Sequence, residues 1–274
     1  QVDAPFAVPQ RPATISNIGR AEDGLRLETP KARIGLYKSY AASMDEGWTR
    51  WIFDQHKVKY ASVVDGDIRA GNLRAKYDCI IFPEQGARQI VEGLARNRYP
   101  AEVAGGLGTE GVAAIKKFVE EGGTVITFND SSEFAIEHLG VGVKNVLRGV
   151  SNRDFYCPGS ILKIEFDPTE ALALGAPALE GRSGEGIAWF ETGPAFETTG
   201  AEARIVARFA AAKDVLLSGW LLGAEKIAGR GAIVEVKRGQ GRIIMFAFRP
   251  QYRGQTVATL PFLFNAIQSS APER

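Results

Sequence analysis

The sequence predicts an α/β protein with a parallel β-sheet that is covered by helices on both faces, followed by a portion richer in β-structure. Between residues 110 and 136 a helical pattern ends at a glycine pair, an apolar β-branched run follows at 124–128, and a new helical pattern begins at Ser131. The same alternation of short apolar runs and helical patterns begins at Ala32. Strands joined in this way through helices favour right-handed crossovers and a parallel sheet.

Short apolar runs separated by helical patterns predict the strands of the first half of the sheet. Strands are predicted at 32–37, 59–64, 78–82 and 124–128. Helices are predicted after Ser43 and at 67–73, 87–95, 109–121 and 131–138. Ser43 and Glu46 form a capping box at the start of the first of these helices. That helix carries Trp48 and Trp51 on one face with Ile52, and we expect both aromatic rings to pack in the core or against another domain.

Beyond Gly140 the helical patterns become rare and β-segments follow one another. They are predicted at 161–166, 203–209, 215–219, 231–237 and 242–248. The four residues at 238–241, Arg-Gly-Gln-Gly, have the length and the glycines of a hairpin loop between the last two segments.

A closing helix is predicted at 255–268, with Leu260, Phe264 and Ile267 as its inner face. Residues 1–30 are rich in proline and polar residues and lack sustained periodicity, so we expect a linker or an arm from a preceding domain. The α/β domain is predicted at 31–270, with its β-rich portion at about 150–240.

Composition narrows the range of partners. The 274 residues are 45% hydrophobic and 24% charged, which is enough for a large core. A formal net charge of +1 gives no long-range attraction for nucleic acid or an anionic membrane. No apolar run approaches the roughly 20 residues of a membrane-spanning helix. The chain begins at Gln1 without a recognisable signal peptide, and we expect it to be a processed or excised piece of a longer protein.

Two cysteines and two histidines limit metal and thiol chemistry. Cys79 lies in the predicted strand 78–82, where a thiol is more often a small apolar side chain than a reactive group. Cys157 lies in a loop beside Pro158 and has no evident His or Asp partner. The sequence leaves open whether the two cysteines pair, but two cysteines in so long a chain do not make a disulfide framework.

The polar break after the strand at 124–128 is a candidate site, because α/β proteins bind ligands at the carboxyl ends of their strands. Asp130 and Ser131 are the catalytic candidates there. A serine nucleophile needs a base, and His138 lies about two turns along the same helix, pointing elsewhere. We favour the alternative that Asp130 or Ser131 caps the following helix.

Other polar residues follow neighbouring strands and are expected at the same rim. The ligand-binding candidates are Tyr40, Asp45, Glu84, Gln85, Asn129 and Arg249. The carboxylates among them could bind a cation or a polar ligand, and Arg249 could neutralise them or bind a carboxylate. Helix capping and salt bridges explain Asp45 and Arg249 without any ligand, and the sequence leaves both possibilities open.

Four segments carry a resemblance to a known family. They are Ser43–Trp51 (SMDEGWTRW), Asp67–Leu73 (DIRAGNL), Phe155–Ser160 (FYCPGS) and Phe248–Arg253 (FRPQYR). Together they resemble the C-terminal, class I glutamine amidotransferase-like domain of bacterial secreted proteins of the zinc carboxypeptidase (carboxypeptidase A-like) family. The resemblance covers roughly residues 30–270. It implies a flavodoxin-like fold, a preceding peptidase-like domain as partner, and a secreted or periplasmic location.

The resemblance also shows what is missing. The family's peptidase site needs a His-x-x-Glu pair around zinc, whereas here Lys59 follows His56 and Val141 follows His138 at that spacing. Zinc is therefore expected only in the parent peptidase-like domain, and no cofactor or metal in this chain. Active amidotransferases place a Cys on a tight strand-to-helix elbow with a later His as base. This chain has no Cys at 128–132 and no His after His138, and its bulky Phe128 and Asn129 argue against the elbow.

These observations lead to three hypotheses. The first is a non-catalytic accessory domain that packs against, or presents substrate to, the peptidase-like domain, and a homo-oligomer is compatible with it. The second is a divergent hydrolase or amidase that uses the 128–132 junction. The third is a module that binds a sugar or peptide at the carboxyl edge of the sheet.

Overall fold

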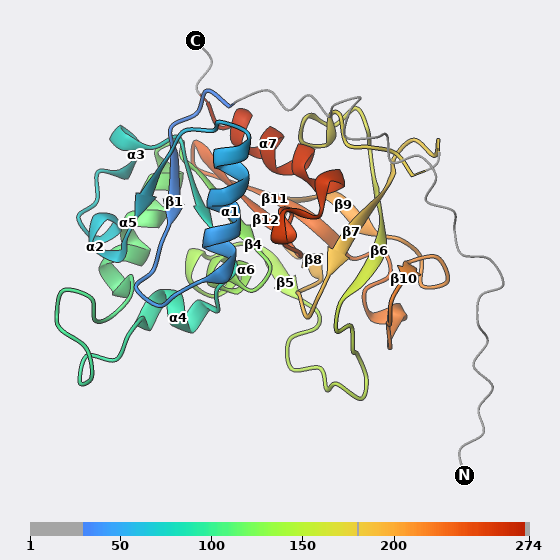
Figure 1. The fold of residues 1–274 in the computed structure, drawn as a ribbon, viewed down its shortest axis with the longest axis horizontal. Coiled ribbons are helices and arrows are strands. Elements are labelled where there is room, and N and C mark those ends of the chain that lie inside the picture. Colours follow the sequence, from blue (N-terminus) through green and yellow to red (C-terminus); the bar gives the residue numbers. More distant parts are fainter. Residues whose placement is uncertain (1–29, 180, 272–274) are drawn as a thin grey trace.

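One continuous β-sheet organises the chain. The computed structural model describes residues 30–179 and 181–271, and within this part twelve strands join in a single sheet (Figure 1). The principal order is β10-β6-β9-β11-β12-β4-β3-β1-β2, with β5, β7 and β8 pairing at its sides. The predicted arm at 1–30 falls outside the described residues, apart from Pro30.

The parallel half of the sheet contains five strands. They are β2 (Tyr60–Val63), β1 (Ile34–Tyr37), β3 (Cys79–Phe82), β4 (Thr124–Phe128) and β12 (Gly241–Phe246). Each is parallel to its neighbour in this order. Every residue of β3 and β4 is buried, as expected for strands covered on both faces.

Helices cover both faces of the parallel half. They are α1 (Met44–Gln55), α2 (Asp65–Arg69), α3 (Leu73–Lys76), α4 (Ala87–Glu92), α5 (Gly108–Glu120), α6 (Ser131–Phe134) and α7 (Leu260–Gln268). A π-helical turn, Ala135–Leu139, continues α6. The rings of His56, after α1, and Phe264, in α7, lie 5.3 Å apart, whereas α5 packs against α2, α3 and α4. The predicted parallel sheet with helices on both faces, extended by extra strands, is confirmed.

The second half of the sheet is antiparallel. It contains β5 (Val143–Asn145), β6 (Ser160–Phe166), β7 (Glu185–Phe190), β8 (Phe196–Thr198), β9 (Ala203–Phe209), β10 (Leu216–Ser218) and β11 (Gly231–Arg238). The predicted hairpin is present, since Arg238 pairs with Gly241 across a two-residue loop in which Gly239 has φ +57°. One strand of this hairpin, β12, also pairs in parallel with β4, and so joins the two halves.

Several predicted details were wrong. The helix at 67–73 is two short helices, α2 and α3, and the closing helix begins only at Leu260, after 3₁₀ turns at Tyr252–Gly254 and Val257–Thr259. Of the two alternatives given for Trp51, packing in the core is wrong, because the residue is 45% exposed and α1 turns Thr49, Ile52 and Phe53 inward; packing against another domain stays a prediction. Ser43 accepts a hydrogen bond from the Glu46 N–H at 3.3 Å, but the Glu46 carboxylate pairs with Arg50.

Both cysteines are buried free thiols in this structure. Burial raises the pKa of Cys79 to about 12, so this thiol stays protonated at neutral pH. None of the described helices is long and apolar enough to cross a membrane.

Candidate functional site

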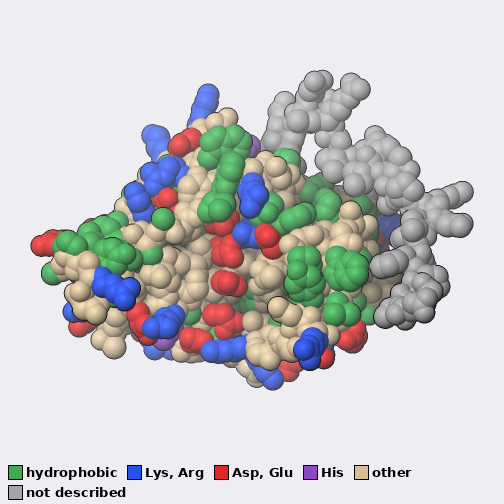
Figure 2. Space-filling view, turned by 60° about the horizontal axis from the view of Figure 1, so that its bottom comes forward, with side chains coloured by type: hydrophobic (Ala, Val, Ile, Leu, Met, Phe, Trp, Pro, Cys, Tyr) green, Lys and Arg blue, Asp and Glu red, His purple; other side chains and the backbone are tan. Residues whose placement is uncertain are grey.

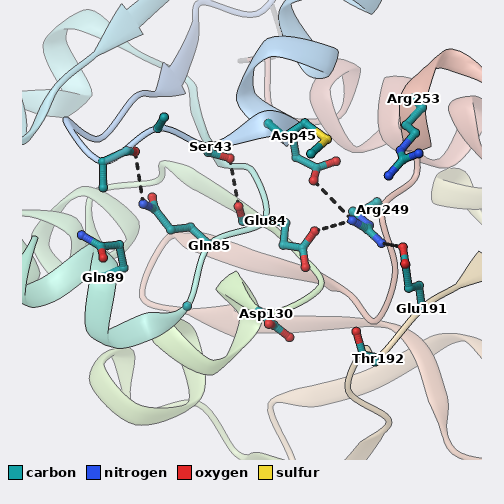
Figure 3. A pocket seen from close by; sticks show the side chains of 14 residues that line it. Ser43, Asp45, Glu84, Gln85, Gln89, Asp130, Glu191, Thr192, Arg249 and Arg253 are labelled. Atoms are coloured by element: carbon teal, nitrogen blue, oxygen red, sulfur yellow. Dashed lines mark hydrogen bonds and ion pairs between the residues drawn. The ribbon is translucent and has the colours of Figure 1, made fainter. Parts of the chain in front are cut away.

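A cleft of about 490 Å³ opens where the carboxyl ends of the parallel strands meet the antiparallel half. Its lining comes from five regions: the residues before and at the start of α1, the β3–α4 loop with the first part of α4, and the loops after β4, β7 and β12. The polar and charged lining residues are Ser43, Asp45, Glu84, Gln85, Gln89, Asp130, Glu191, Thr192, Arg249 and Arg253 (Figure 3). Figure 2 shows acidic side chains in a row across this face, with hydrophobic side chains on both sides.

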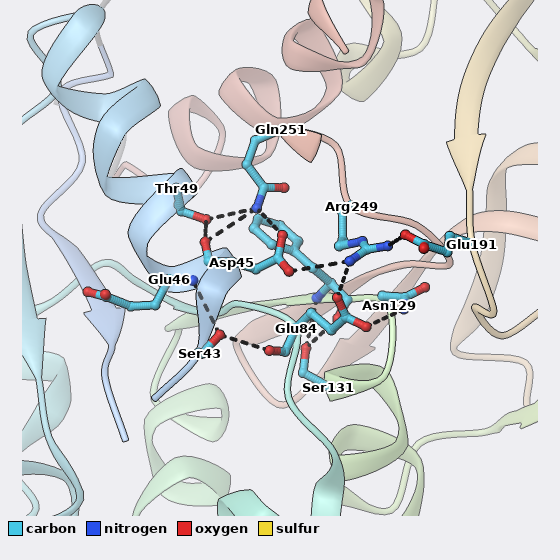
Figure 4. Close-up of polar contacts among 11 residues, drawn as sticks. Ser43, Asp45, Glu46, Thr49, Glu84, Asn129, Ser131, Glu191, Arg249 and Gln251 are labelled. Atoms are coloured by element: carbon cyan, nitrogen blue, oxygen red, sulfur yellow. Dashed lines mark hydrogen bonds and ion pairs between the residues drawn. The ribbon is translucent and has the colours of Figure 1, made fainter. Parts of the chain in front are cut away.

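Arg249 is the centre of the ion-pair network in the cleft (Figure 4). Its Nη1 atom lies 2.7 Å from Glu84 Oε2 and 3.5 Å from Asp45 Oδ2, and its Nη2 atom pairs with Glu191. The guanidinium also lies over the ring of Tyr252, 4.6 Å from its centroid, and Tyr252 stacks on Trp189. One cation thus ties together α1, the β3–α4 loop and the β7–β8 loop.

Gln251 fixes the position of the Asp45 side chain. The Gln251 Nε2 atom donates to Asp45 Oδ1 at 3.1 Å and to Thr49 Oγ1 at 3.1 Å, and Gln251 is completely buried. Burial raises the pKa of Asp45 to about 7, a hydrogen bond with Glu84 adds to the rise, and Arg249 opposes it. Asp45 and Glu84 are therefore close enough for the ionisation of one to disfavour that of the other.

Asp130 lines the cleft, where the residue as a whole is exposed although its carboxyl group is partly desolvated, and it makes no side-chain capping bond to α6, so the predicted cap is wrong for this residue. Its pKa is raised to about 6, first by burial of the carboxyl group and then by the nearby Glu84 and Glu133. Within the described residues it has no hydrogen bond or ion pair from its side chain. Asp130 is thus the one cleft carboxylate whose side chain has no hydrogen bond or ion pair among the described residues.

The strand-to-helix elbow is present, contrary to the prediction from its bulky residues. Asn129 joins β4 to α6 with φ +50°, in the left-handed region that non-glycine residues seldom adopt. Its N–H donates to Phe246 O at 2.9 Å, and its Nδ2 donates to Glu84 Oε1 at 2.8 Å. Asparagine tolerates this conformation better than most residues, which explains how the elbow persists beside the bulky Phe128.

Ser131 is placed where its hydroxyl supports the backbone. The Oγ atom accepts from the Phe128 N–H at 2.8 Å and can donate to Phe82 O, also at 2.8 Å. The residue is fully buried, so this oxygen links the ends of β3 and β4 and does not face the cleft. Ser131 thus serves the turn in a different way from the predicted helix cap.

Comparison with solved structures identifies the fold. A cytoplasmic protein from Salmonella typhimurium aligns over 86% of this chain and 98% of its own, with a TM-score of 0.52 and 12% identity. A putative GMP synthase component from Thermoplasma acidophilum aligns over 87% of this chain and 94% of its own, with a TM-score of 0.51 and 9% identity. The chain has a glutamine amidotransferase-like fold. At these identities the likeness concerns the fold alone. No protein-family model matches the sequence, and curated proteins give no match.

Asn129 occupies the left-handed elbow between β4 and α6, within the junction 128–132 at which the resemblance leads one to expect a nucleophile. Neither His56 nor His138 lines the cleft: the His56 ring packs on Phe264, and His138 lies beside Phe134 and Glu137. Among residues 30–179 and 181–271, no three His, Cys, Asp or Glu side chains are arranged to hold a metal ion. Three of the cleft carboxylates, Asp45, Glu84 and Glu191, pair with Arg249.

The structure brings together most of the predicted rim. Asp45, Glu84, Gln85 and Arg249 line the cleft. Asn129 does not line it, but its side-chain amide donates a hydrogen bond to the lining residue Glu84. Tyr40 does not line the cleft and is 42% exposed. The Ser39 hydroxyl bonds both to the N–H and to the carbonyl of Ala41, and this tight turn leaves Tyr40 at its exposed tip.

The prediction missed Glu191, Thr192 and Gln89 as lining residues. A usable signal was present, because Glu191 and Thr192 follow the apolar run at 185–190 and precede a Gly-Pro pair, as at the end of a strand. Three of the five described non-glycine residues with positive φ surround the cleft: Asn129, Thr192 and Arg253. Such backbone strain concentrates at functional sites, and here it coincides with the charged cleft.

Proposed function

We propose that this chain is a non-catalytic accessory domain of a zinc carboxypeptidase-family protein, secreted or periplasmic like that family. The observation that carries the proposal is Asn129, which replaces the expected nucleophile at an otherwise intact elbow. Its amide is committed to Glu84, and Glu84 to Arg249, so the position contributes to an ion-pair network where an active member would need a free thiol. The zinc carboxypeptidase-family parent protein in this proposal rests on the family resemblance of residues 30–270.

The alternative of a hydrolase or amidase at 128–132 has little support. A serine nucleophile must be accessible and paired with a base. Ser131 is fully buried and bonded to backbone groups, and neither histidine lines the cleft.

A ligand-binding module is favoured by a separate observation, the cleft itself. It is open, holds charges of both signs, and is surrounded by strained backbone. This role is compatible with an accessory domain, since a module that presents substrate to a peptidase must bind part of that substrate.

The accessory role is tested by association with the peptidase-like part of the parent protein. We expect the two parts, made separately, to form a complex in sedimentation velocity at micromolar concentration. An unrelated amidotransferase-like domain is the control. No complex at high micromolar concentration, or a parent gene that encodes no His-x-x-Glu module before Gln1, would overturn the proposal.

A further inference from the structure

The outer face of α1 carries an apolar stripe that the described residues leave partly exposed. Met44, Trp48 and Trp51 are spaced i, i+4 and i+7, so they lie on one side of the helix. Met44 is 65% exposed and Trp51 45% exposed, and the two indole rings meet edge to face at 6.0 Å. The opposite face of α1 packs against the rest of the domain through Ile52 and Phe53, so these exposed apolar side chains are additional to the core contact, which is typical of a helix that a partner covers.

The stripe is continuous with the cleft. Met44 belongs to both, because it also lines the cleft beside Asp45. Trp51 lies against Gly254, where an added side chain would collide with the indole ring, and Gly254 adjoins the cleft residue Arg253. An extended ligand can therefore contact the stripe and the cleft at the same time.

The cleft is lined by more acidic than basic side chains. Four carboxylates (Asp45, Glu84, Asp130 and Glu191) face two guanidinium groups. Arg249 already pairs with three of these carboxylates, and Arg253 lies over the Tyr252 ring, so Asp130 has no ion-pair partner among the described residues. A cationic side chain reaching Asp130 would gain a charge-assisted hydrogen bond, while its methylene stem could rest on Met44.

The geometry points to a docking surface for an extended polypeptide segment that carries a lysine or arginine next to apolar side chains. The basic side chain enters the cleft toward Asp130, and the apolar neighbours cover Met44, Trp48 and Trp51. Charge complementarity selects this partner, because an acidic cleft repels nucleic acid and anionic membranes. Exposed tryptophan and arginine, here Trp51 and Arg253, are the residue types that dominate binding energy at protein interfaces. The inference deepens the proposed function, on which it rests for the role of an accessory domain.

The test uses an array of immobilised pentapeptides with lysine, norleucine or glutamate at the centre and leucine, phenylalanine or serine at the flanks. We expect the intact chain to bind best to central lysine with apolar flanks at low ionic strength. Asp130→Asn should weaken that binding by about tenfold and remove the preference for lysine over norleucine. Trp51→Ala should weaken binding to peptides with apolar flanks by a similar factor.

Two variants serve as matched controls. Asp214→Asn removes an exposed carboxylate outside the cleft, and Trp220→Ala removes a tryptophan that is 55% exposed but lies in the antiparallel half. Both should bind like the unaltered chain, and circular dichroism should show that all four variants are folded. Equal binding to lysine and norleucine peptides, or equal effects of Trp51→Ala and Trp220→Ala, would overturn the inference. Because this array needs no peptidase-like domain, its failure is distinct from a failure to form the complex.

Discussion

Replacing Asp45 by asparagine should stabilise the protein at alkaline pH, although Asp45 lies in the centre of the polar network. Asparagine keeps the acceptor for Gln251 Nε2 and replaces the proton that Asp45 shares with Glu84 by an N–H. Folding raises the pKa of Asp45 from 3.8 to about 7, so the folded state binds this proton more tightly than the unfolded state. The contribution of Asp45 to stability is therefore fully present below about pH 4 and is lost as pH rises to about 7.

The magnitude follows from the pKa. Each pH unit of increase corresponds to about 1.4 kcal/mol, so a rise from 3.8 to about 7 allows at most about 4 kcal/mol. This limit already includes the opposing effect of Arg249, and it assumes that the asparagine N–H replaces the proton shared with Glu84 fully, so part of the gain should be lost. We expect Asp45→Asn to increase the free energy of unfolding by about 2 kcal/mol at pH 8 and by much less at pH 5.

Urea unfolding of both proteins at pH 5 and pH 8 measures the effect, with Asp214→Asn as a control for the loss of an exposed carboxylate. The reasoning is refuted if Asp45→Asn destabilises the protein at pH 8, or if the difference between the two proteins is the same at both pH values. The first result would mean that Asp45 is held ionised by Arg249. The second would mean that the folded protein does not raise its pKa.

Two further substitutions test the same network. Arg249→Met should lower the free energy of unfolding by about 3 kcal/mol at pH 8, because Asp45, Glu84 and Glu191 would then face one another without a cation between them. The loss should be smaller at pH 5, where carboxylates take up protons. An equal loss at both pH values would contradict this expectation. Asn129→Ala and Asn129→Gly both lose the hydrogen bond to Glu84, but only alanine is strained at φ +50°, so the glycine variant should be more stable by about 1 kcal/mol in parallel urea titrations. Equal stability of these two variants would show that the elbow relaxes.

The sequence predicts the parallel strands well because they are buried on both faces. Cys79–Phe82 and Thr124–Phe128 are short continuous apolar runs between helical patterns, and such runs have few alternatives. The partners of Gly241–Phe246 could not be predicted in the same way. Its apolar side chains suit a hairpin with β11 and a parallel ladder with β4 equally, and only the complete fold brings both neighbours to it.

The site residues that could be predicted are polar or charged residues that follow a recognisable strand. Asp45, Glu84 and Arg249 each come soon after a run of buried strand residues, and parallel strands bring their carboxyl ends to one edge. Glu191 was not predicted as a site residue because the strand before it alternates buried and half-buried residues, and no helical patterns flank that strand to mark its ends. The exposure of Trp51 could not be seen from spacing, since the face at i, i+3 and i+4 is equally compatible with the core or with a partner.

The elbow shows that strain at a strand-to-helix junction does not by itself identify a nucleophile. The ladders of β4 with β3 and β12 extend to the end of the strand, and the Asn129 N–H prolongs them by its bond to Phe246 O. Ser131 must already begin α6, and its hydroxyl fixes the Phe128 N–H, so the chain has few residues in which to change direction. The left-handed conformation at Asn129 is thus required by the fold whether or not a reaction occurs there. The residue best suited to this position is one that tolerates the conformation and can bond to the neighbouring loop. Asn129 adopts this conformation and bonds to Glu84, and the same bond connects the elbow to the charges that shape the cleft.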